Sequence, residues 1–217
     1  MPTFDLLQGP QTLARYDVIG EHSANSPRFV RHIALYNADG DEVNHGQRLD
    51  VVHMGPPLEP NGKIRAHVAG RVPLTSAEIA RIEVWIEKRI DEYRESKPDA
   101  GRQYIIDPPW KDELDTNTGV RIYRRFSCAG FVLDAHLQVD IELLVMDKQA
   151  LPEVDEQTLA SGYPHAVRKW DRIADFGMEG EGPWRIVLAG YVLHALNRSG
   201  EEIRHEAYQA QVGDERF

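Results

Sequence analysis

The segment from Thr75 to Ser96 has the strictest periodicity in the chain and constrains the fold most. Thr75 and Glu78 fit a capping box, in which both side chains accept hydrogen bonds from free amides at a helix start, and Pro98 ends the helix. Apolar residues recur at three- and four-residue steps and share one helix face, namely Ile79, Ile82, Ile86, Ile90 and Tyr93. We expect this helix to cover one side of a sheet.

Extended segments come before and after this helix. Phe29 to Asn37 and Arg48 to Met54 are mostly apolar, and a turn with Asp39 and Gly40 at its centre follows the first of them. Residues 62–74 predict a weaker strand, residues 99–121 a long surface loop, and residues 183–212 two strands joined by a turn. The order predicts an α+β fold with an antiparallel sheet and a C-terminal β-hairpin.

The composition indicates one folded domain without nucleic acid as a partner. Of the 217 residues, 41% are hydrophobic and 28% are charged, and the formal net charge is −10, which repels phosphate backbones. We expect a single domain over residues 1–217, with its core at about 25–145 and a C-terminal elaboration at about 150–217. No apolar segment is long enough to span a membrane, and no signal peptide is evident.

Cys128 is the only cysteine, so the chain forms no intramolecular disulfide, which fits a reducing compartment and a cytoplasmic location. With Ser127 as the cap, the thiol lies in the first turn of a helix, where free amides and the helix dipole favour an anion. Arg124 and Arg125 would add to this effect, so we expect a lowered thiol pKa and a nucleophilic thiolate, with the Cys128 amide as an oxyanion donor. The alternative is an inert core cysteine.

Two histidines lie in the extended segments, each among apolar neighbours. His32 belongs to the first segment and His53 to the second, and neighbouring antiparallel strands can bring two such side chains together. A cysteine nucleophile needs a base, and the base needs an orienting partner. We therefore expect Cys128 as nucleophile, His32 as base and His53 as orienting residue, the alternative being that both histidines are structural.

These segments resemble the NlpC-type papain-like superfamily, in its circularly permuted branch that includes lecithin retinol acyltransferase-like proteins. The resemblance rests on "HIALY" (32–36), "VVHMGPP" (51–57) and "CAGFV" (128–132), in the order typical of that branch, and it covers roughly residues 29–140. It implies a papain-like sheet packed against the cysteine helix and the same three roles for His32, His53 and Cys128. It names no cofactor.

The chain departs from that pattern in the longer segment between the two histidines. Asn44, His45 and Gln47 lie in it and are rivals to His53 for the third position. A metal site is a further alternative, with His45, His53 and His67 as ligands and Asp50 nearby, although no ligand pair has a characteristic spacing.

The function we expect is hydrolysis of an amide or peptide bond, or of an ester, by a cysteine hydrolase through a thioacyl intermediate. An acyltransferase on the same fold is an alternative, and so is a catalytically inactive binding or scaffold module. The expected partner is a peptide, amide or acyl-containing small-molecule substrate. A peptide or isopeptide amide comes first, because the chain lacks the hydrophobic C-terminal anchor that lipid-acting relatives often carry.

Overall fold

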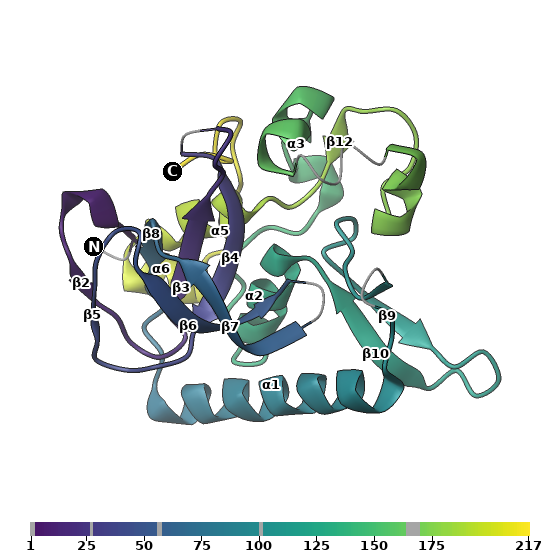
Figure 1. The fold of residues 1–217 in the computed structure, drawn as a ribbon, viewed down its shortest axis with the longest axis horizontal. Helices are drawn as coiled ribbons and strands as arrows, with labels where there is room; N and C mark the ends of the chain where they lie inside the picture. Colours follow the sequence, from purple (N-terminus) through teal and green to yellow (C-terminus); the bar gives the residue numbers. More distant parts are fainter. Residues whose placement is uncertain (1–2, 27, 56–57, 100–101, 164–169) are drawn as a thin grey trace.

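In the computed structural model, which describes residues 3–26, 28–55, 58–99, 102–163 and 170–217, an antiparallel sheet of six strands lies against several helices (Figure 1). The strand order is β1-β8-β3-β4-β6-β7. Their bounds are Thr3–Asp5 (β1), Val18–His22 (β3), Val30–Tyr36 (β4), Arg48–Met54 (β6), Leu58–Arg65 (β7) and Val68–Gly70 (β8). The strands expected at 29–37 and 48–54 are confirmed, and they pair with each other through Leu35–Val52 and Tyr36–Val51.

The helices begin where the chain provides capping side chains. α1 (Ser76–Ser96) has the expected capping box between Thr75 and Glu78, and α2 (Cys128–Leu137) begins after Ser127. The remaining helices are α3 (Glu156–Gly162), α5 (Ala189–Leu196), α6 (Gly200–His205) and the short 3₁₀ segments Leu6–Gln8, Lys148–Ala150 and Trp170–Phe176. In the described part of the chain, every helix is too short or too polar to cross a bilayer.

Three further pairs of short strands complete the structure. β9 (Trp110–Leu114) and β10 (Arg121–Phe126) form a hairpin, which projects beyond one end of α1 in Figure 1. The other pairs are β2 (Gln11–Thr12) with β5 (Glu42–Val43) and β11 (Glu153–Val154) with β12 (Trp184–Arg185). The surface loop expected over residues 99–121 was therefore wrong, because β9 and part of the turn before β10 lie within it.

The C-terminal β-hairpin is also wrong, since α5 and α6 occupy that segment. Almost every residue of α5 is buried, so it lacks the polar face by which a surface helix is recognised. Residues of α5 join those of α1, α2 and β4 in one hydrophobic cluster, so the C-terminal segment contributes to the main core. The second cluster lies between the sheet and the N-terminal segment and includes Leu13, Ala34, Tyr36 and Val51.

Candidate active site

The start of α2 holds Cys128 in a fixed position directly after β10. The Ser127 hydroxyl accepts a hydrogen bond from the Gly130 amide at 2.8 Å, and the Ser127 amide donates to the Pro109 carbonyl at 2.9 Å. A Cβ at position 130 would lie 1.9 Å from that carbonyl oxygen, so glycine is required for the segment before β9 to pack on the helix. Both the expected cap and the position of the cysteine in the first turn are confirmed.

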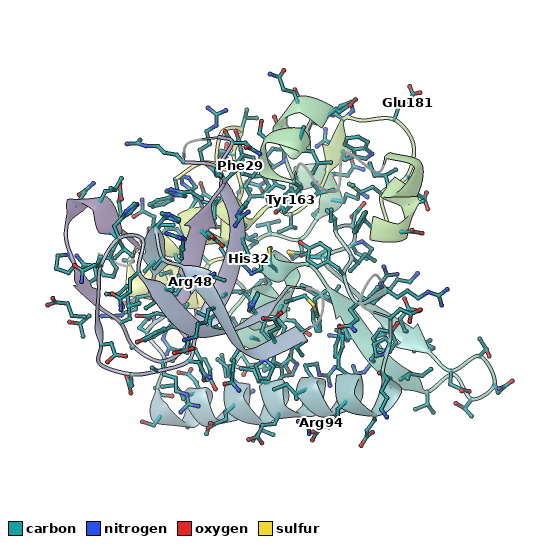
Figure 2. The ribbon with its side chains drawn as sticks, in the orientation of Figure 1. Phe29, His32, Arg48, Arg94, Tyr163 and Glu181 are labelled. Atoms are coloured by element: carbon teal, nitrogen blue, oxygen red, sulfur yellow. The ribbon has the colours of Figure 1, made fainter. Side chains whose placement is uncertain are left out.

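The thiol of Cys128 is enclosed, with 1% of the residue exposed. The backbone amide of Ile33 in β4 donates a hydrogen bond to the sulfur. The Tyr104 hydroxyl lies 3.9 Å from the sulfur, and the Tyr163 hydroxyl also forms a hydrogen bond with the thiol. Figure 2 labels His32 and Tyr163 near the centre of the molecule, where α2 packs against β4.

The expected lowering of the thiol pKa is wrong, because burial raises the pKa of Cys128 more than its hydrogen bonds lower it. The arginines cannot compensate. Arg124 is bound by Asp112 at 2.6 Å and by Asp134 at 2.7 Å, and Arg125 donates to backbone carbonyls at 2.7 and 2.8 Å. The thiol therefore rests protonated at neutral pH.

The Tyr104 hydroxyl lies between the sulfur and the backbone amide of Cys128. The backbone amide of Cys128, the expected oxyanion donor, donates a hydrogen bond to the Tyr104 hydroxyl oxygen. Burial raises the pKa of Tyr104 well above its ordinary value, so the hydroxyl keeps its proton and remains a donor. The sequence pattern placed Tyr104 in a long surface loop and gave no sign that it reaches the cysteine.

His32 and His53 meet as the strand arrangement suggested. The distance between His32 Nε2 and His53 Nδ1 is 2.8 Å, and the rings are nearly perpendicular, at 83°. On the other side of His53, its Nε2 lies 3.3 Å from Glu59 Oε2 in β7, where the register pairs the two residues directly. Glu59 was not among the expected site residues, and we refer to Glu59, His53 and His32 as the carboxylate-histidine chain.

The Glu59 carboxylate determines which ring nitrogen carries the proton in each histidine of the carboxylate-histidine chain. Ionised Glu59 only accepts, so His53 carries its proton on Nε2 and presents a lone pair at Nδ1. His32 must then donate from Nε2, which leaves the lone pair of its Nδ1 free to act as a base. Burial lowers the pKa of both histidines, that of His32 to about 3, so both rings are neutral as this assignment requires.

The third expected contact, between His32 and the thiol, is not formed: among the described residues, no hydrogen bond joins Cys128 to His32 or to His53. The two residues are related only by position, because Ile33, whose amide contacts the sulfur, follows His32 in the chain. The structure thus brings the two histidines together and places the cysteine beside β4, the strand that carries His32.

The rivals for the third position lie elsewhere. The Asn44 amide donates to Gln47 Oε1 at 3.1 Å within a turn, and His45 packs its ring against His67 at 4.9 Å. Neither arrangement contacts His32.

The alternative metal ligands are not gathered into one site. His45 and His67 are together, but His53 is bound to His32 and Asp50 pairs with Lys63 at 3.2 Å. Over the described ranges, no group of three or more His, Cys, Asp or Glu side chains is arranged to hold a metal ion.

Comparisons with protein-family models, with curated proteins and with solved structures give no match to this chain.

Proposed function

We propose that the protein is a cysteine hydrolase acting on amide or peptide bonds, or on esters, on a permuted papain-like fold of the NlpC type. The observation that carries the proposal is the carboxylate-histidine chain, which leaves a lone pair on His32 in the strand that also contacts the Cys128 sulfur. Glu59 and His53 act as positioning residues that hold the tautomer of His32.

The neutral state of both groups determines how the thiol is activated. With a raised thiol pKa and a lowered imidazole pKa, a resting thiolate-imidazolium pair is disfavoured. Nδ1 of His32 therefore takes the thiol proton as the sulfur attacks the carbonyl carbon, and it returns that proton to the leaving group. Water, deprotonated by His32, then hydrolyses the thioester; another acceptor in place of water would make the protein an acyltransferase.

The carbonyl oxygen becomes an oxyanion during this attack. The Cys128 amide and the Tyr104 hydroxyl are the donors available to it, once a substrate oxygen takes the place that the hydroxyl oxygen occupies at the amide. Because the thiol is enclosed, Tyr104 and Tyr163 must move when the substrate enters.

The test uses 4-nitrophenyl acetate as a small activated ester. We expect wild-type protein to release 4-nitrophenol and to carry an acetyl group on Cys128, found by peptide mapping after rapid acid quench. Cys128→Ala should lose both signals, whereas Ala129→Ser, a small change at the next helical position, should keep them. Equal release by wild type and Cys128→Ala would refute the proposal.

A binding module without catalysis is the second candidate, and the enclosed, protonated thiol favours it. The two candidates differ in how iodoacetamide alkylation of Cys128 depends on His32. A catalytic base should speed alkylation near pH 7, so His32→Ala should slow it there, whereas an ordinary thiol should show the same pH profile in both proteins.

A further inference from the structure

Away from the cysteine, α1, β10 and Gln138, which follows the end of α2, line an open hollow of about 740 Å³. Five of the residues that line it are cationic, and none of them is acidic: Arg81, Lys88, Arg89, Arg121 and Arg124. Four carboxylates outside this lining pair with the arginines, namely Glu92, Asp112, Asp134 and, at 3.4 Å from Arg81, Asp140. Five cations against four carboxylates leave one excess positive charge here in a chain with a formal net charge of −10, and that excess favours a negative ligand.

Carboxylates behind the hollow hold its arginines in place. Glu92 Oε1 binds Arg89 at 2.7 Å and Arg121 at 3.1 Å, while Asp112 and Asp134 bind Arg124 from two sides. Glu92 does not itself line the hollow, and its other oxygen, Oε2, has no hydrogen-bond partner in the described part of the chain. The guanidinium groups are therefore fixed before any ligand arrives, which lowers the entropic cost of binding.

Two of the cationic side chains still have unused hydrogen-bonding capacity. Arg89 is 2% exposed, and its Nε is buried without an acceptor among the described residues, a state that is unfavourable for a charged group. Lys88 is exposed and forms no ion pair within the same residues. An anionic group in the hollow would supply acceptors to both.

The wall of the hollow also includes apolar surface. Val84 is 65% exposed there, and Trp85 lies beside it with the Arg89 guanidinium 5.8 Å from its ring centroid. A ligand with an apolar body would cover Val84, while its charged end meets Lys88 and Arg89.

We propose that this hollow binds a small organic anion, in which a phosphate or carboxylate group is joined to an apolar, ring-sized body. The site is separate from Cys128 and does not depend on the hydrolase proposal. Phenyl phosphate and benzoate are the probes for the two headgroups, inorganic phosphate tests the need for the apolar body, and benzyl alcohol tests the need for charge.

The experiment is a titration of the full chain at low ionic strength, followed by NMR or calorimetry. At least one aryl anion should bind saturably below about 10 mM, and more tightly than inorganic phosphate and benzyl alcohol. Lys88→Glu should weaken that binding at least about fivefold, because an attractive charge becomes a repulsive one. Lys111→Glu makes the same charge change on β9 outside the hollow and should alter it less than about twofold.

Three results would overturn the proposal: no saturation with either aryl anion, equal binding of inorganic phosphate or benzyl alcohol, or equal affinities in Lys88→Glu and Lys111→Glu. Lys88 is exposed and forms no ion pair among the described residues, so its replacement leaves the buried ion pair between Arg89 and Glu92 intact and the variant should fold.

Discussion

Two groups of histidines lie in or beside the sheet and are built differently. The carboxylate-histidine chain is joined by hydrogen bonds from end to end, whereas His22, His67 and His45 are joined mainly by ring contacts. The rings of His22 and His67 are stacked at 5.1 Å and 9°, and His45 lies across His67 at 4.9 Å. The one hydrogen bond between these residues runs from the His22 backbone amide to His67 Nδ1, at 3.1 Å. We refer to these three residues as the histidine stack.

The two groups differ in whether a carboxylate fixes the tautomers of the rings, which a histidine needs if one particular nitrogen is to act as a base. A carboxylate at one end of the first group determines which nitrogen of each ring carries a proton. The histidine stack ends on no carboxylate hydrogen bond within the described residues, so it has packing but no such direction. Under the proposed function, proton transfer therefore belongs to the first group, and the second has a structural role.

The largest expected effect is a loss of activity when the imidazole of His32 is removed, compared with removal of the imidazole of His67. His32→Ala should lower kcat/KM for 4-nitrophenyl acetate by about 10²–10⁴-fold, as loss of a general base does. His67→Ala should change it less than about twofold. Steady-state rates of the two variants measure this directly, and comparable losses in both would end the distinction between the groups.

A smaller effect is expected from Glu59→Gln. A glutamine can donate to His53 Nε2 as well as accept from it, so the fixed tautomer of His32 is lost, and kcat/KM should fall about 10–100-fold. The exposed Glu201→Gln is the control. ¹⁵N shifts of the His32 ring should change in the first variant only; unchanged shifts together with a full loss of rate would show that Glu59 does not act through the tautomer.

Gly62→Ala tests the carboxylate-histidine chain without removing any of its three side chains. A Cβ at this position would lie 2.1 Å from His53 Nε2 and 2.9 Å from Glu59 Oε2, so the His53 ring must shift. We expect a several-fold loss of kcat/KM with KM nearly unchanged. Gly200→Ala, whose Cβ would meet only Pro73 at 3.1 Å, is the control and should retain full activity.

The smallest expected effect concerns the acid stability of the histidine stack. Burial and the neighbouring histidines lower the pKa of His22 to about 4, against an ordinary value near 6.5. Between these values the unfolded chain binds more protons, so this stability is complete above about pH 6.5 and is lost as the pH falls towards 4. His22→Phe keeps an aromatic ring and should reduce the slope of unfolding free energy against pH in that range, by up to about 1 kcal/mol per unit, in urea titrations.

Sequence patterns predicted the part of the fold where periodicity and capping agree. The strands at 30–36 and 48–54, the helix from Ser76 and the helix start at Cys128 all carry such local signals. α6 carries one that was overlooked, since Ser199 and Glu202 form a capping box within the segment expected to be a turn and a strand. β9 and β10 carry none, because their charged side chains are held by cross-strand pairs such as Arg124 with Asp112.

The site was predictable only where neighbouring strands determine it. The meeting of His32 and His53 follows from the pairing of β4 with β6. To predict that Glu59 contacts His53, one must know the register of β6 with β7. That register shifts between Val51 and His53, and no local pattern reveals such a shift. The raised pKa of the thiol depends on enclosure by Tyr104 and Tyr163, which are distant from Cys128 in the sequence.

The position of β7 at one end of the sheet has a consequence for aggregation. An edge strand exposes unpaired backbone groups, to which a strand of another molecule can add. β7 contains Pro60, which has no amide to donate, an irregular register opposite β6, and the charged Lys63. At the opposite edge, β1 has only three residues. Each edge is therefore a poor template for intermolecular strand pairing, which protects the sheet from growing into fibrils at high protein concentration.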